Sequence, residues 1–95
     1  MAKGRFSIAA ALAVLSFEAA AASSVELPKE SPFPESVIAA TDGTLFVSSI
    51  SNGGVLRIKP NGKPEAFVKP GGYGTGTTFG VNLDEKSGTL WVCSN

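Results

Sequence analysis

Residues 43–49, Gly-Thr-Leu-Phe-Val-Ser-Ser, recur 45 positions later as residues 88–94, Gly-Thr-Leu-Trp-Val-Cys-Ser. A repeat in so short a chain indicates what kind of fold contains it. Repeats of about 40 to 50 residues that consist of short strands are typical of β-propeller blades, each a four-stranded sheet packed around a central channel. The repeat therefore predicts an all-β propeller, and its second copy ends about halfway through a blade.

Turn signals between apolar runs divide the rest of this segment into strands. Asp42-Gly43 and Asn61-Gly62 are hairpin signals, because glycine and asparagine accept the positive φ that a tight turn requires. The spacing of about ten residues predicts an antiparallel meander. Strands are expected at residues 36–40, 45–49, 55–59 and 64–68, and a second blade is expected to begin with strands at 79–83 and 90–94.

The distribution of apolar side chains predicts how the strands pack. The strand at 45–49 is apolar on both faces, as expected for a blade that lies between two others. In the strand at 55–59, Leu56 and Ile58 form one face, and Val55, Arg57 and Lys59 form the other. The face with Arg57 and Lys59 is expected to be in contact with water. Phe46 and Trp91 hold the same position in the repeat, so we expect them on equivalent faces, filling the space between blades, with at least one partly exposed.

The N-terminus has the features of a secretory signal peptide. Lys3 and Arg5 precede an apolar run from residue 6 to 17, and Ala20-Ala21-Ala22 matches the pattern that signal peptidase cleaves. The alternative is an uncleaved membrane anchor, but the run is shorter than the roughly 20 residues that a span needs. We therefore expect a signal-peptide helix at 1–22, export to the periplasm or the exterior, and no membrane association after cleavage.

The remaining chain divides into two parts. Residues 23–33 carry prolines that oppose a helix, and they are expected to form an extended lead-in. Residues 34–95 are expected to form a partial propeller, with one blade at 34–70 and a half-blade at 77–95. Lys69 to Thr78 is rich in glycine but matches neither nucleotide-binding fingerprint, so a connection between blades is the better interpretation.

Composition excludes several classes of function. Without Lys3, Arg5 and Glu18, six basic and seven acidic side chains remain, and no basic patch suits nucleic acid. The chain has no histidine, which rules out a Ser-His-Asp triad and imidazole-rich zinc sites within these residues. A small-molecule substrate is still possible.

Cys93 is the single cysteine of a chain that is expected to enter an oxidising compartment. Free cysteine is among the most buried residue types, so the simplest expectation is a small buried side chain on a strand. The alternative is a disulfide with a cysteine of another segment or another chain.

Several motifs together resemble the start of proteins of the senescence marker protein/gluconolactonase/LRE-like family. They are Phe-Pro-Glu-Ser-Val at 33–37, Asp-Gly-Thr-Leu-Phe-Val at 42–47, Gly-Gly-Val-Leu-Arg at 53–57, Thr-Phe-Gly-Val at 78–81 and Leu-Trp-Val-Cys-Ser-Asn at 90–95. The resemblance covers about residues 33 to 95. It implies a six-bladed propeller with one divalent cation on the axis, calcium first among the candidates, and hydrolysis of sugar lactones.

The resemblance also implies a metal ligand, Glu35, at the place of the glutamate in the family's Glu-Gly-Pro motif. This chain reads Pro-Glu-Ser there, so the alternative is an exposed glutamate at the start of a strand. Asn95 could supply a second polar group. One carboxylate and one amide are too few for the six to eight oxygen ligands of calcium, so tight binding by this chain alone is not expected.

Three functions therefore compete. The first is an exported hydrolase whose cation polarises a lactone carbonyl and activates water. The second is a non-catalytic propeller that binds a ligand or a protein on one face. The third is a truncated N-terminal fragment without activity, since about three repeats are needed to bury a continuous core. The sequence favours the third for this chain and the first for its full-length relatives.

Overall fold

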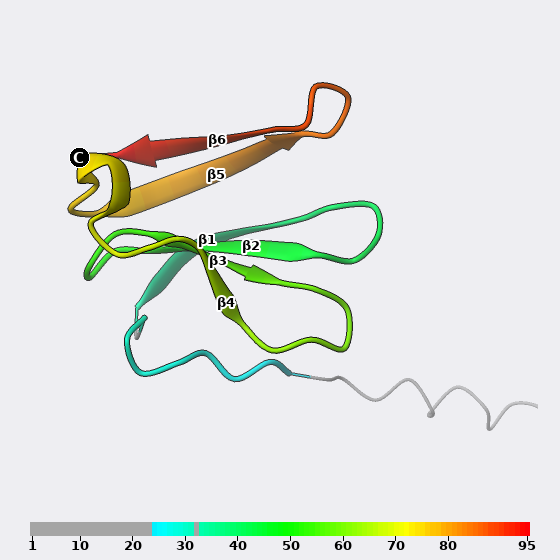
Figure 1. The fold of residues 1–95 in the computed structure, drawn as a ribbon, viewed down its shortest axis with the longest axis horizontal. Helices are drawn as coiled ribbons and strands as arrows, with labels where there is room; N and C mark the ends of the chain where they lie inside the picture. The colour runs from blue at the N-terminus through cyan, green and yellow to red at the C-terminus, as the bar shows by residue number, and fades with distance from the viewer. Residues whose placement is uncertain (1–23, 32) are drawn as a thin grey trace, which may run out of the picture.

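The computed structural model describes residues 24–31 and 33–95, and it is all-β in this part of the chain (Figure 1). The expected signal peptide at 1–22 lies outside the described residues. Two antiparallel sheets are present, with strand orders β1-β2-β3-β4 and β5-β6, as the meander prediction required. The strands are β1 (Pro34–Ala39), β2 (Leu45–Ser49), β3 (Val55–Ile58), β4 (Glu65–Val68), β5 (Thr78–Asp84) and β6 (Thr89–Ser94).

Helical structure is limited to one short 3-10 turn, η2 (Gly72–Gly74), among the described residues. This turn lies in the glycine-rich segment between the sheets. Between residues 24 and 95, apart from residue 32, we find no helix with the length and apolar character needed to cross a bilayer.

The first hairpin turn is stabilised by its aspartate. The backbone N–H of Thr44 donates a 2.8 Å hydrogen bond to Oδ1 of Asp42, and this bond holds the pKa of the carboxyl below its ordinary value of 3.8. Gly43 has a φ of 93°, a backbone conformation that residues other than glycine adopt only with strain. The Asp-Gly pair thus acts as the sequence predicted.

The two hairpins, β1-β2 and β5-β6, are close copies with one difference. Each has an irregular register at its open end, between Pro34 and Val37 in the first and between Thr78 and Val81 in the second. Ala39 pairs with Leu45, whereas Leu83 pairs with Leu90, so the second turn is one residue longer. The spacing of 45 residues therefore relates β2 to β6, and a spacing of 44 relates β1 to β5.

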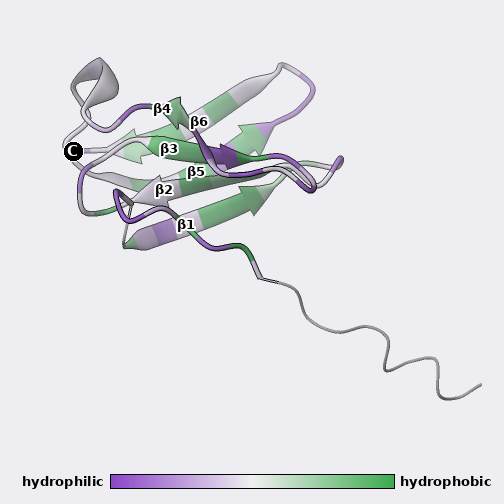
Figure 2. Ribbon diagram, turned by 60° about the horizontal axis from the view of Figure 1, so that its bottom comes forward, coloured by the Kyte–Doolittle hydropathy of each residue, from purple (hydrophilic) through white to green (hydrophobic). Residues whose placement is uncertain are grey.

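One face of the first sheet forms the apolar core. Val47, Leu56 and Ile58 are buried there, and Leu27 from the lead-in packs against them. The lead-in is held to the sheet by bonds such as that from the Ile50 N–H to the Phe33 carbonyl, 3.0 Å. It carries a turn at residues 29–30, so it is less extended than expected. Figure 2 shows the apolar residues along the strands and the polar residues in the turns.

The opposite face of the first sheet lies toward β5 and β6. Phe46 meets Phe67 edge to face, with ring centroids 5.3 Å apart, and the Arg57 guanidinium lies 5.2 Å from the Phe67 ring centroid. Val55 on this face is only 2% exposed. The expectation of a wet face at 55–59 is therefore wrong for Val55, which lies next to the Gly54 carbonyl that Thr78 of β5 contacts, whereas Arg57 is partly exposed and Lys59 is exposed.

A buried threonine joins the two sheets. Thr78 is completely buried, and its hydroxyl accepts a 2.9 Å bond from the Ser49 N–H. The same hydroxyl lies 3.0 Å from the Ser49 carbonyl oxygen and 2.7 Å from the Gly54 carbonyl oxygen, and its single proton can be donated to either of them. At Gly54, where φ is 83°, a Cβ atom would lie 2.7 Å from the Val68 carbonyl oxygen, so only glycine fits.

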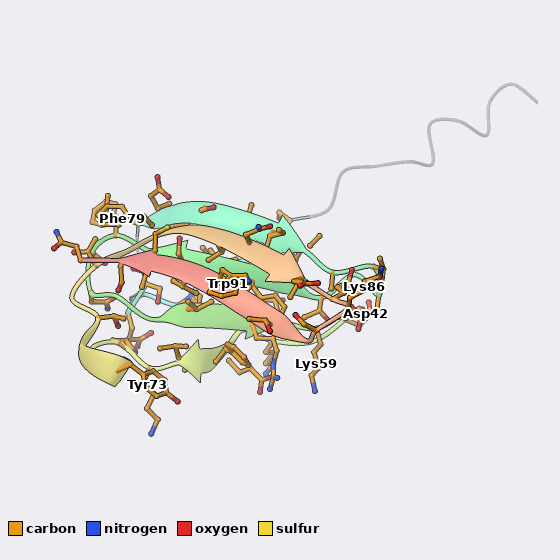
Figure 3. All side chains as sticks on the ribbon, turned by 90° about the horizontal axis from the view of Figure 1, so that it is seen from above. Asp42, Lys59, Tyr73, Phe79, Lys86 and Trp91 are labelled. Atoms are coloured by element: carbon orange, nitrogen blue, oxygen red, sulfur yellow. The ribbon has the colours of Figure 1, made fainter. Side chains whose placement is uncertain are left out.

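Phe46 and Trp91 lie on equivalent faces, as predicted. Phe46 faces the second sheet, where it lines a hollow with Leu83 and Leu90. Trp91 pairs with Asn82 and points away from the first sheet, on a face that no described element covers (Figure 3). It is 64% exposed, which agrees with the expectation that at least one of the pair would be partly exposed.

Cys93 lies on β6 as expected, but it is exposed. The expectation of burial was wrong. The side chain shares the uncovered face with Trp91, two residues away, so its exposure has the same cause. Within the described residues it has no disulfide partner.

The first testable prediction concerns the link between the sheets. Replacement of Thr78 by valine keeps its shape but removes the hydroxyl, which leaves the buried N–H of Ser49 without an acceptor. We expect the free energy of unfolding to fall by about 1 to 3 kcal/mol. Urea denaturation followed by the fluorescence of Trp91 measures it. Thr77→Val, next along the chain, is the control and should change stability by less than about 0.5 kcal/mol; equal effects would contradict the role of the Thr78 hydroxyl.

A second prediction compares the two repeat positions. Phe46→Ala removes an aromatic ring that is packed between the sheets, and it should destabilise the chain by about 2 to 3 kcal/mol. Trp91→Ala removes a ring that is mostly in water and should cost less than about 1 kcal/mol. Thermal unfolding followed by circular dichroism compares both variants, and an equal or larger loss for Trp91→Ala would mean that the face of Trp91 is covered in solution.

Candidate functional site

Glu35 lies at the beginning of β1, where the chain enters the first sheet, and its side chain is exposed. The register between β1 and β2 is irregular here, since Pro34 pairs with Ser49 but Val37 pairs with Val47. Two residues of β1, Glu35 and Ser36, therefore lie opposite the single residue Ser48 of β2, which is a β-bulge. Such bulges often occur near active sites because they redirect a side chain.

The surroundings of Glu35 are mostly apolar. It lines a shallow hollow of about 230 Å³ together with Pro34, Val37 and Val47. The nearest hydroxyl on the facing strand, that of Ser48, accepts a 3.2 Å bond from the Ser36 N–H. Within the described residues Glu35 makes no hydrogen bond and no ion pair, so its carboxylate is free to bind a ligand there.

Asn95 follows β6 at the same end of the stacked sheets. Its backbone N–H donates to the Thr77 carbonyl, 3.1 Å, and its own carbonyl accepts from the Gly76 N–H, 3.1 Å. Because β1 begins and β6 ends beside the Ser49–Thr78 link, Glu35 and Asn95 lie at one end of the fold. No hydrogen bond joins the two residues.

These residues do not make up a calcium site. A calcium ion takes six to eight oxygen ligands, and at this end of the fold Glu35 is the one carboxylate that the sequence predicted. Among residues 24–31 and 33–95, no three His, Cys, Asp or Glu side chains come close enough to hold a metal ion. The residues that the structure describes therefore offer part of a donor set at most.

The structure also has a site that the sequence did not predict, the hollow between the two sheets. We call it the inter-sheet hollow. It measures about 410 Å³ and lies between β5-β6 and the face of the first sheet that carries the aromatic pair. Phe46, Arg57 and Phe67 line it on one side, and Leu83 and Leu90 on the other. The pairing of Phe46 with Arg57 across β2 and β3 follows from the hairpin register, but the sequence alone left that register open.

Charged groups surround one end of this hollow. Arg57 pairs with Glu65 through a 3.0 Å contact from Nε to Oε1, and both side chains are partly exposed, so the pair adds little stability. Glu85 bridges the turns of the two hairpins by accepting from the Thr41 N–H, 3.2 Å, and the Thr41 hydroxyl, 3.0 Å. The hollow is therefore apolar at its centre with polar groups at its rim.

The glycine-rich segment at 69–78 connects the two sheets, as the sequence predicted. Its centre is η2, where Tyr73 has a positive φ of 55° and is 95% exposed. The segment approaches the first sheet so closely that a Cβ atom on Gly53 would lie 2.6 Å from the Thr75 carbonyl oxygen.

Comparisons of this chain with models of protein families, with curated proteins and with solved structures found no match.

Proposed function

We propose that the described residues form one blade and the first two strands of the next blade of an exported β-propeller of the senescence marker protein/gluconolactonase type. The activity we propose for the propeller that contains these strands is metal-dependent hydrolysis of a lactone. In that ring Glu35 supplies one of several oxygen ligands to the cation. By itself the 95-residue chain is proposed to be inactive.

The observation that carries the proposal is the matching direction of the two repeats. Phe46 points from the first sheet to the second, and Trp91 points onward from the second sheet to an uncovered face. Both hairpins also have their register irregularity at the same open end. A stack in which each sheet faces the next in the same sense supports a propeller, because blades follow one another around an axis in this way.

The place of Glu35 supports its role as a ligand. It lies on β1, the strand next to which β5 stacks, and at the end of the fold where Asn95 also lies. In a propeller the first strand of each blade lies nearest the axis, so side chains at the starts of these strands converge. The inward groups of other blades would have to complete the donor set, since one carboxylate does not hold calcium tightly.

Calcium titration tests whether the 95-residue chain alone supplies enough ligands to bind the ion tightly. Isothermal calorimetry on the full 95-residue chain should give a dissociation constant no tighter than about 1 mM, the weak end of calcium sites. A pH-indicator assay should detect no lactone hydrolysis above background. Micromolar binding that is lost in Glu35→Gln but kept in the control Glu26→Gln would overturn the proposed inactivity and would make Glu35 the ligand of a complete site.

The coding sequence beyond the codon of Asn95 tests the propeller itself. We expect further repeats of about 45 residues, with Asn and Asp on the strands that correspond to β1, and lactone hydrolysis by the longer product. Apolar or aromatic residues at those positions would instead favour a propeller that binds a ligand without catalysis. A stop codon with no further repeats in any frame would contradict the proposal.

A further inference from the structure

The chain contains two Asn-Gly pairs, Asn52-Gly53 and Asn61-Gly62. In such a pair the backbone nitrogen of the glycine can attack the side-chain amide carbon of the asparagine, because glycine has no side chain to obstruct the approach. The attack closes a five-membered succinimide ring. Both asparagines precede glycine, so the sequence alone does not distinguish them, and the structure decides which of them is free to react.

Asn52 is fixed at both atoms of its amide group. Its Oδ1 accepts a 3.1 Å bond from the Ser49 hydroxyl, and its Nδ2 donates to the Glu30 carbonyl in the lead-in. Gly53 is buried, and a Cβ atom there would lie 2.6 Å from the Thr75 carbonyl oxygen. Ring closure at this pair would break both side-chain bonds and move a closely packed backbone, so the structure protects Asn52.

Asn61 has no such restraints on its side chain. It is exposed, and among residues 24–31 and 33–95 its amide group makes no hydrogen bond. Its φ of 58° is left-handed, a conformation that is costly for a residue with a side chain. The attacking nitrogen is protected by one bond, the 2.8 Å bond from the Gly62 N–H to the Lys59 carbonyl that closes the turn. Opening of the turn releases this bond and the unfavourable φ together.

The position of Asn61 keeps it accessible. It lies in the turn between β3 and β4 (Figure 1). Because β3 ends at Ile58 and β4 begins at Glu65, the turn extends past the part of the sheet on which another sheet stacks, and its exposure does not depend on what covers the two faces. Lys59 and Lys63 flank the pair, and their positive charges stabilise the negative charge that develops on the attacked amide.

We propose that Asn61 is a site of spontaneous covalent modification, in which it loses its side-chain amide and becomes aspartate or isoaspartate. The Gly62 nitrogen gives its proton to solvent and bonds to Cγ of Asn61, and the bond from Cγ to Nδ2 breaks as Nδ2 takes a proton from solvent and leaves as ammonia. Water then opens the ring at either of its two carbonyls. The reaction consumes only water and involves no metal ion or lactone, so its test is independent of the proposed function.

The modification alters the outermost strand of the first sheet. In the isoaspartyl product the backbone runs through the side-chain carbons of residue 61 and is one atom longer, which is incompatible with the turn bond between Lys59 and Gly62. This turn sets the register of β4 against β3, so β4 becomes less firmly paired. Both products also add one negative charge between Lys59 and Lys63.

Peptide mapping by mass spectrometry, applied to the full chain during incubation in buffer, measures the two sites separately. Asn61 should convert at least about ten times faster than Asn52, a factor that corresponds to about 1.4 kcal/mol in the barrier. Its rate should rise with pH, because the attacking nitrogen must lose a proton. In denaturing urea the two rates should become equal, since the bonds to Asn52 are then absent. Circular dichroism establishes that the chain in buffer is folded.

Two variants separate the roles of the two pairs. Asn61→Gly retains a residue that accepts the left-handed φ but removes the amide, so the product at this position should disappear while the urea midpoint stays unchanged. Ser49→Ala removes one bond to the Asn52 amide. It should accelerate conversion of Asn52 by about two- to tenfold, the range that one hydrogen bond gives, and leave the rate at Asn61 as it was.

Hydrogen exchange of the converted chain tests the structural consequence. The amides of β4 should exchange faster after conversion, and those of β1 should not change. Three outcomes would overturn the proposal: equal rates at Asn52 and Asn61 in the folded chain; no product at Asn61 after a period that converts the denatured chain; and unchanged exchange in β4 once isoaspartate has formed.

Discussion

The hydroxyl of Thr78 is the contact on which the arrangement of this chain depends. It accepts from the Ser49 N–H and donates its one proton to the carbonyl of Ser49 or of Gly54, at the point where β2 ends and β5 begins. These groups are buried, so each would lose its bond to water without a replacement partner if the hydroxyl were absent. Because the link is at one end, the two sheets meet closely there, and the inter-sheet hollow opens toward the hairpin turns. Glu35 lies near the link, whereas Phe46 and Phe67 line the hollow.

Much of the fold could be predicted from the sequence, because it is encoded by signals that act over a few residues. Asp42-Gly43 and Asn61-Gly62 set the turns, and the alternation of apolar residues set the strands between them. The 45-residue spacing of Phe46 and Trp91 also predicted their common direction. Each of these features depends on local backbone preference or on the two-residue period of a strand. Both are set by the local sequence and do not depend on the rest of the fold.

The features that were missed depend on contacts between segments far apart in the chain. Val55 is buried beside Gly54, whose carbonyl Thr78 of β5 contacts, and Cys93 is exposed because no described element covers its face of β6. Both residues lie on a strand beside an apolar neighbour, so the alternation of side chains along the strand could not show which of them is buried and which is exposed. The role of Thr78 was likewise invisible, since its partners lie 24 and 29 residues away. For the candidate site, the sequence placed Glu35 at the start of a strand, but whether other donors converge on it depends on three-dimensional neighbours.

The additional residue in the turn between β5 and β6 has a consequence for how such repeats diverge. It displaces β5 by one position relative to a strict 45-residue copy, so Glu35 corresponds to Phe79 in the sheet register and not to Gly80. Because the added residue lies in the turn, it changes the spacing along the sequence and leaves the pairing within the hairpin unchanged. A comparison of the two copies at a fixed spacing therefore matches the wrong residues in the first strand of each hairpin, although it matches the right ones in the second.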